Sequence, residues 1–163
     1  MTQITPEYAI EDWVVHQHYG VGQIKKVEIK PINGKRVICF RVKIKNGVFW
    51  FPTNLLENPR VRPVSTQRTI NKALKLLKTI NEDLDTDRKV WKSKIDQAKS
   101  NCDLLEMCQL IRDLVTLKKL RKLNQTEEEA LDYLKECVLR EWSVSTHTDL
   151  EMNRAKLDGY LQA

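Results

Sequence analysis

The stretch that decides the fold runs from Asp12 to Gly22 and reads Asp-Trp-Val-Val-His-Gln-His-Tyr-Gly-Val-Gly. Its apolar start, residues 13–15, is typical of a β-strand, and Gly20 and Gly22 permit a sharp bend or bulge before the chain extends again. An apolar strand followed by a tight corner is typical of a small antiparallel β-domain. The stretch therefore predicts such a domain in the N-terminal part of the chain.

The residues that follow continue the pattern of short strands and tight turns. Asn33-Gly34 and Asn46-Gly47 are strong hairpin signals, because Asn-Gly readily supplies the positive φ angles of a two-residue loop. Residues 48–51 form the last clear strand, and residues 55–64, with two prolines and no periodicity, form a connection that closes a small barrel. Residues 37–45 alternate, and we predict a buried face made of Ile38, Phe40, Val42 and Ile44.

Alternation in the last strand places one tryptophan on the outside of the barrel. If Phe49 and Phe51 face inward, then Trp50 faces outward. An exposed tryptophan on a small barrel is a favoured anchor for a protein partner. The alternative is that Trp50 packs on the helical half of the same chain.

From Ser65 onward the hydrophobic period becomes that of α-helices. The first helix, capped by Ser65 or Thr66, carries an apolar stripe that runs as far as Ile80. Capping boxes, Thr126 with Glu129 and Thr148 with Glu151, open the last two helices. The pattern predicts a bundle of five short helices that begin near residues 66, 86, 104, 126 and 148.

Charge is unevenly distributed along the chain, whose net charge is +6. Residues 1–62 carry ten Lys and Arg against five acids, residues 63–122 carry fourteen against eight, and residues 123–163 carry four against nine. A basic body with an acidic end suggests a polyanionic partner for the middle of the chain. A merely solvated basic surface is an equally good explanation of the charge alone.

Several classes of protein are not expected. No run of about 18 apolar residues is present, and the N-terminal segment is acidic without an apolar core, so we expect a cytoplasmic protein without a membrane helix or secretory signal. No phosphate-binding loop, glycine-rich nucleotide fingerprint or Ser/His/Asp constellation suggests an enzyme. His16 and His18 alternate on the expected strand and so point to opposite faces, which disfavours a shared metal. We expect no cofactor and no metal, and free buried thiols at Cys39, Cys102, Cys108 and Cys137.

Three of these features together resemble a known family. The stretch Asp12–Gly22, the Asn33-Gly34 turn and the strand ending in Phe51-Pro52 resemble the Tudor-like RNA-polymerase-interacting domain shared by CarD-family regulators and the transcription-repair coupling factor. The helical remainder, including residues 111–114 and 126–141, is similar to the C-terminal domain of CarD proteins. The resemblance implies an α+β chain with a Tudor-like β-barrel at residues 1–62 and a helical, DNA-contacting domain at residues 63–163.

The resemblance also implies a function. CarD-type proteins bind the β subunit of bacterial RNA polymerase through the barrel, while the helical domain touches promoter DNA at the upstream edge of the transcription bubble. The expected partners are therefore the polymerase β subunit and, weakly and without sequence preference, promoter DNA. We expect a monomer outside the polymerase complex and a location at the nucleoid. The matching polymerase-binding positions are Lys30, Arg41 and Trp50, and the DNA-binding positions are Arg88, Lys89, Trp91, Lys92, Lys118 and Lys119.

The chain departs from the family pattern in the second helix. Family members typically begin this helix with a tryptophan that wedges into the minor groove, and Asp87 occupies that position here. Either Trp91 takes over as the wedge, or Trp91 belongs to the core, where Ile95 and Ala98 share its vicinity. A protein-only scaffold, whose helical domain docks another protein, is the alternative to a DNA-contacting regulator.

Overall fold

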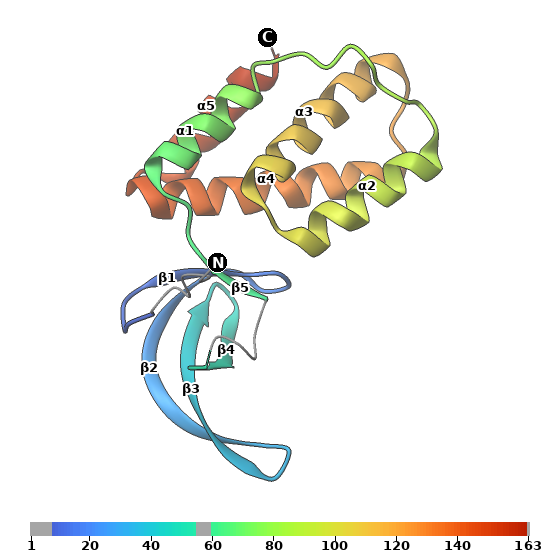
Figure 1. The fold of residues 1–163 in the computed structure, drawn as a ribbon. Coiled ribbons are helices and arrows are strands. Elements are labelled where there is room, and N and C mark those ends of the chain that lie inside the picture. The colour runs from blue at the N-terminus through green and yellow to red at the C-terminus, as the bar shows by residue number, and fades with distance from the viewer. Residues whose placement is uncertain (1–7, 55–59, 163) are drawn as a thin grey trace, which may run out of the picture. The chain divides into compact units, whose positions relative to one another are not determined.

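The computed structural model describes residues 8–54 and 60–162. The chain divides into two compact units, Met1–Val64 and Ser65–Ala163. The first unit is an antiparallel sheet and the second is a set of α-helices (Figure 1). The α+β class predicted from the sequence, a small β-domain followed by five helices, is confirmed.

The β unit is one five-stranded sheet with strand order β4-β3-β2-β1-β5. Neighbouring strands are antiparallel throughout. Asn33 and Gly34 join β2 to β3 with φ angles of 51° and 77°, which confirms the predicted two-residue hairpin. The strands are β1 Trp13–His16, β2 Gly20–Ile32, β3 Lys35–Ile44, β4 Gly47–Pro52 and β5 Val61–Pro63.

The inner face of this sheet forms a small apolar core. Phe49 and Phe51 point into it, as the alternation in β4 predicts. Tyr8 packs against it edge-on, with its ring at 87° to that of Phe51. The buried members are Val14, Ile24, Phe40, Val42, Phe49, Phe51 and Val61.

The two glycines of the opening stretch serve different purposes. Gly20 has a φ angle of 78°, a left-handed conformation that disfavours any side chain. Gly22 is required by close approach instead, because a Cβ atom there would lie 2.6 Å from Cγ1 of Val42 and 2.9 Å from Cγ2 of Ile44. The corner thus combines a left-handed turn at Gly20 with a close approach of β2 to its neighbour β3 at Gly22.

Three expectations about the strands need correction. Ile38 lies on the inner face as expected but is 54% exposed, because β4 ends at Pro52, opposite Cys39. Beyond that point β2 and β3 continue as a curved two-stranded ribbon with nothing in the described sheet to cover it (Figure 1). The second hairpin loop is Lys45-Asn46, one residue earlier than predicted, since Ile44 pairs with Gly47. Part of the predicted connection, Val61–Pro63, is a strand that pairs with β1.

The helical unit begins with α1, whose N-cap is Thr66, as expected. This helix ends at Leu76, so Ile80 lies beyond it and is 79% exposed rather than part of the stripe. The capping box of α4 is Asn124 with Glu127, not Thr126 with Glu129, because Asn124 precedes the helix start by the required single residue. The helices are α1 Gln67–Leu76, α2 Arg88–Asn101, α3 Leu104–Leu120, α4 Gln125–Thr146 and α5 Leu150–Gln162.

The start of α5 also differs from the prediction. The side chain of Asp149 accepts a hydrogen bond from the backbone N–H of Met152 at 2.9 Å, so Asp149 caps this helix. Thr148 is used differently: its hydroxyl accepts a hydrogen bond of 2.7 Å from the side-chain amide of the buried Asn153. The expected capping box of Thr148 with Glu151 is therefore replaced by an Asp cap.

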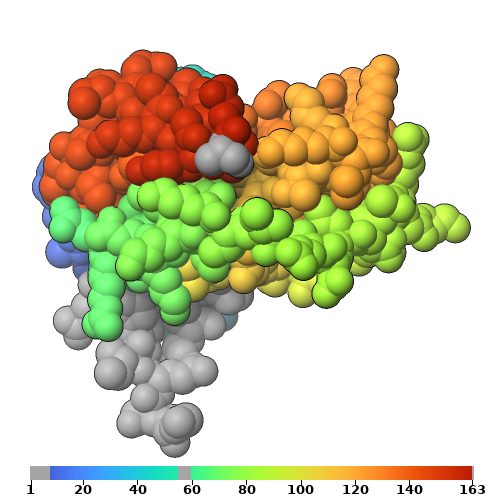
Figure 2. Space-filling model, turned by 90° about the horizontal axis from the view of Figure 1, so that it is seen from above, coloured from blue at the N-terminus to red at the C-terminus, as the bar shows by residue number. Residues whose placement is uncertain are grey.

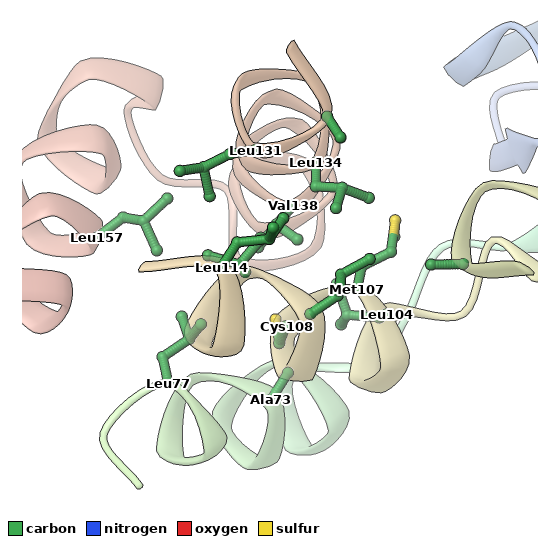
Figure 3. Close-up of a cluster of buried hydrophobic side chains, with 14 of the residues drawn as sticks. Ala73, Leu77, Leu104, Met107, Cys108, Leu114, Leu131, Leu134, Val138 and Leu157 are labelled. Carbon is green, nitrogen blue, oxygen red and sulfur yellow. The ribbon is translucent and has the colours of Figure 1, made fainter. Parts of the chain in front are cut away.

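The helices share one apolar core (Figure 3). Helix α3 lies at its centre and packs against α1, α2 and α4. The close-up shows Ala73 of α1 and Leu77, the C-cap of that helix, on one side of α3, and Leu131, Leu134 and Val138 of α4 on the other. In the described part of the chain, no helix is both long and apolar enough to cross a membrane.

Candidate functional site

A β-bulge in β2 determines which side chains share the outer face of the sheet. The pairing of β2 with β3 shifts between Ile24 and Lys26, so Lys25 is the extra residue. After the shift, Lys26 pairs with Arg41, which pairs in turn with Trp50 on β4. Residues directly opposite in neighbouring strands lie on one face, so the three side chains form a row across the outer face.

Glu28 stands at the centre of this face and joins the polymerase-binding candidates together. Its carboxylate accepts a hydrogen bond of 2.9 Å from Nε1 of Trp50 and lies 3.7 Å from Arg41 and 3.9 Å from Lys30. Nζ of Lys30 also lies 4.0 Å from the centroid of the Trp50 ring. The structure therefore brings Lys30, Arg41 and Trp50 together, and we name Lys26, Glu28, Lys30, Arg41 and Trp50 the outer-face cluster.

The ion pairs around Glu28 lower the pKa of its carboxyl group. The hydrogen bond from Lys26, 2.7 Å from the Glu28 carboxylate, is the largest cause of a lowered Glu28 pKa, and the hydrogen bond from Trp50 comes next. Glu28 is therefore ionised at neutral pH and balances one of the three cations beside it. Sequence reasoning missed Glu28, although the spacing of Lys26, Glu28 and Lys30 at every second residue was a usable signal.

A buried cysteine lies beneath this cluster. Cys39 pairs with Glu28 on one side and with Pro52 on the other, so it belongs to the outer face. It is nevertheless fully buried, and burial raises the pKa of its thiol. The simple alternation rule therefore fails at this small residue, which lies between Glu28 and Pro52 in the sheet. Long polar side chains with apolar stems can cover such a position.

The second candidate site lies at the start of α2. Asp87 is the N-cap of this helix: its side chain accepts a hydrogen bond of 2.9 Å from the backbone N–H of Lys89. Arg88, Lys89 and Lys92 follow on the exposed surface. Asp87, which occupies the family's wedge position, therefore caps α2, and only a short polar side chain caps a helix well.

The C-terminal end of α3 lies against the start of α2. Nε of Arg121 donates a 3.2 Å hydrogen bond to the backbone oxygen of Thr86. The same guanidinium makes two hydrogen bonds, of 2.9 and 2.7 Å, to the carboxylate of Glu127 at the start of α4. This Arg121 clamp ties the end of α3, which carries the exposed Lys118 and Lys119, to the approach to α2. Figure 2 shows the two segments, lime and orange, at the same end of the helical unit.

Trp91 does not share this surface. It is fully buried, and its Nε1–H donates a 2.5 Å hydrogen bond to the backbone oxygen of Asp85. The neighbours Ile95 and Ala98 are buried with it in the helical core. The structure thus favours the core alternative for Trp91 over the wedge alternative, and the remaining basic positions form a cluster without it. We name Arg88, Lys89, Lys92, Lys118, Lys119 and Lys122 the basic cluster.

The two histidines of the opening stretch are closer than alternation suggests. β1 ends at His16, and the turn that follows brings the rings of His16 and His18 to 5.8 Å between centroids. Nδ1 of His16 accepts hydrogen bonds from the backbone N–H groups of His18 and Tyr19, at 3.0 and 3.3 Å. Burial lowers the pKa of His16, so the ring is neutral at pH 7. Within residues 8–54 and 60–162, no group of three or more His, Cys, Asp or Glu side chains is placed to hold a metal ion.

Comparison with known proteins now gives the N-terminal unit its family. Residues 8–65 match the family model of the CarD-like/TRCF RID domain. The N-terminal domain belongs to the CarD-like/TRCF RID family. RID domains interact with RNA polymerase, and the outer-face cluster lies within the matched residues of this one.

A longer similarity extends beyond the RID domain into the helical unit. The chain is 28% identical over 144 residues to the Bacillus subtilis (strain 168) protein named "Putative transcription factor YdeB". The match covers 84% of this chain and 91% of that protein. The resemblance to CarD proteins is confirmed, and the matched RID domain together with the name of this relative supports a transcription-related role.

Proposed function

We propose that this CarD-like protein binds the β subunit of bacterial RNA polymerase through the outer-face cluster and contacts promoter DNA through the basic cluster. In this proposal the DNA contact lies near the upstream edge of the transcription bubble, and the pair of contacts tunes the stability of the open complex. The observation that carries the proposal is the convergence of Lys30, Arg41 and Trp50 around Glu28 on one face of an RID domain.

The outer-face cluster has the properties of a protein-binding surface. Trp50 is 37% exposed, held in place by Glu28 and flanked by Lys30, so its ring is pre-oriented before a partner arrives. Tryptophan and arginine are among the residues in which interface hot spots are enriched. Pre-orientation reduces the entropy lost on binding, which makes such an anchor effective.

Trp50→Ala is expected to weaken binding to RNA polymerase by about 30-fold, the effect of losing a hot-spot contact of about 2 kcal/mol. Lys30→Glu is expected to weaken it as well, because the charge reversal also repels Glu28. Trp13→Ala is a matched control, since Trp13 lies on β1 in the same domain and is 38% exposed. Biolayer interferometry with immobilised core polymerase measures all three affinities. Equal affinities for wild type and Trp50→Ala would refute this site.

The basic cluster has the properties of a phosphate-binding surface. It consists of exposed lysine and arginine side chains at the start of α2 and the end of α3, and the Arg121 clamp ties the end of α3 to the approach to α2. The positive end of the α2 dipole also points outward at this place, which favours phosphate groups. Such contacts position a protein on DNA without reading its sequence.

The triple charge reversal Arg88→Glu, Lys89→Glu and Lys92→Glu is expected to weaken binding to a promoter duplex and flatten its salt dependence. Each lost phosphate contact lowers the slope of log affinity against log salt by about 0.9. A control reversal of the exposed Lys72 and Lys156, on α1 and α5, should leave the slope unchanged. Fluorescence anisotropy at several salt concentrations measures the slope. Binding that is absent, or independent of salt, would instead support a scaffold that docks another protein.

A further inference from the structure

A hollow of about 300 Å³ opens on the outer face of the sheet, beside the β-bulge. Its walls are three cations, Lys25, Arg41 and Lys43, and one apolar side chain, Val48. Lys25 is the extra residue that the bulge adds to β2, and the next residue, Lys26, pairs with Arg41. The bulge therefore turns two consecutive lysines toward the same face, which a regular strand does not allow.

Strand pairing holds the cations of this hollow together. Lys43 pairs with Val48 of β4, and Arg41 lies two residues from Lys43 on β3, so these side chains share one face. Lys25 and Lys43 are exposed, and Arg41 is half-buried. Like charges that face one another across neighbouring strands destabilise a sheet. An anion that enters the hollow removes this repulsion.

The acids of this face do not neutralise the hollow. Glu28 is shared among the three cations and the tryptophan of the outer-face cluster. The carboxylate of Glu11 accepts a hydrogen bond of 3.1 Å from the side-chain amide of Gln23. Among the residues that the structure describes, no carboxylate pairs with Lys25 or Lys43. The hollow therefore keeps an excess of positive charge in the folded protein.

The charge of the hollow favours a phosphate-rich ligand. One carboxylate balances a single cation, whereas an oligophosphate carries several negative charges and balances all three. The planar guanidinium of Arg41 binds phosphate oxygens in pairs, and the lysine ammonium groups add point charges beside it. We propose that this hollow is a binding site for oligophosphates, either free or as the phosphate tail of a nucleotide.

Occupation of the hollow affects the outer-face cluster. Arg41 belongs to both, and Val48 lies two residues before Trp50 on the same face of β4. A bound oligophosphate therefore occupies Arg41 and places negative charge beside Trp50. Docking of the polymerase and binding of the anion then exclude each other, so the oligophosphate inhibits docking. This second step rests on the proposed polymerase contact.

The direct test is a nuclear magnetic resonance titration of the ¹⁵N-labelled full chain with sodium tripolyphosphate and, separately, with ATP. The amide signals of residues 25, 41, 43 and 48 follow this site by itself and are expected to shift with both ligands. The double variant Lys25→Gln, Lys43→Gln is expected to weaken binding about 100-fold, or about tenfold for each lost charged contact. The control Lys72→Gln, Lys156→Gln removes two exposed lysines of the helical unit and should bind as wild type does.

Two comparisons separate this site from general attraction to a basic protein. Lys118→Gln with Lys119→Gln removes two cations of the basic cluster and should leave the shifts unchanged. Loss of the shifts in this variant, or full affinity in the Lys25→Gln, Lys43→Gln variant, overturns the site. Citrate, a tricarboxylate of lower charge, is expected to bind more weakly than tripolyphosphate. Equal affinities for the two anions overturn the assignment to oligophosphates.

Biolayer interferometry with immobilised core polymerase tests the inhibition. Saturating tripolyphosphate is expected to weaken docking of the wild-type chain at least about tenfold, and sodium chloride at the same ionic strength should weaken it less. Docking that tripolyphosphate leaves unchanged overturns the inhibition and leaves the anion site in place. If the chain does not bind polymerase even without the anion, the proposed function and the inhibition are overturned together. The resonance titration decides the anion site in either case.

Discussion

Trp91→Ala is expected to lower the free energy of unfolding of the helical unit by about 3–5 kcal/mol, the usual cost of replacing a buried tryptophan with alanine. Trp91 is fully buried among the helices, so its removal leaves a cavity. The carbonyl oxygen of Asp85 also loses its hydrogen bond from the indole. Denaturation with urea, followed by far-ultraviolet circular dichroism, measures this loss.

Two further variants make the Trp91 result specific. Trp91→Phe keeps an aromatic ring but loses the hydrogen bond, and is expected to cost about 1–3 kcal/mol less than the alanine variant. Lys92→Ala changes the next residue, which is exposed, and should alter stability by at most about 0.5 kcal/mol. A Trp91→Ala protein that unfolds as wild type does would contradict the burial of this side chain. The wedge alternative for Trp91 would then have to be considered again.

Glu127→Gln is expected to destabilise the helical unit by about 3 kcal/mol at pH 7, because it leaves the paired Arg121 guanidinium without a counter-charge. Arg121 joins three segments: the approach to α2, the end of α3 and the start of α4. Loss of the carboxylate charge therefore loosens all three. Thermal or urea denaturation at pH 7 measures the difference, and the exposed neighbour Glu128→Gln should change stability by only about 0.5 kcal/mol.

The loss of stability caused by Glu127→Gln should be larger at neutral pH than in acid. Hydrogen bonding to Arg121 is the largest cause of the lowered Glu127 pKa. A carboxylate with a lowered folded-state pKa stabilises the protein above its unfolded pKa of about 4.3, and this contribution is lost as pH falls through the folded value. Wild type and Glu127→Gln should therefore differ most at neutral pH and converge in acid below about pH 4. A difference that stays constant from pH 7 to strong acid would contradict the ion pair.

Much of the fold follows from local pattern. The Asn33-Gly34 hairpin, the inward Phe49 and Phe51, and the start of α3 agree with the sequence, since each depends on neighbours along the chain. The errors lie where a partner element decides the outcome. Ile38 has the right face but is exposed, because the length of β4 is a property of the sheet and not of β3.

In the candidate sites, too, local pattern is predictable from the sequence, whereas contacts between elements are not. The family resemblance suggested Lys30 and Arg41, but the bulge at Lys25 that brings them to one face with Glu28 is a property of strand pairing. The Arg121 clamp joins residues 35 positions apart, and short-range periodicity contains no signal for it. The burial of Trp91, by contrast, has a local sequence signal, because its apolar neighbours on α2 were sufficient to favour it.

The β2–β3 ribbon has a consequence for behaviour at high protein concentration. Beyond the end of β4, one edge of residues 35–37 faces away from β2, and the paired Ile29 and Ile38 are both exposed there. Such a strip is a template on which a second chain could add a strand and start aggregation. Lys35 and Arg36 stand at its tip, and their charges oppose the approach of an identical copy. The same two cations that oppose an identical copy would leave the strip open to an oppositely charged strand.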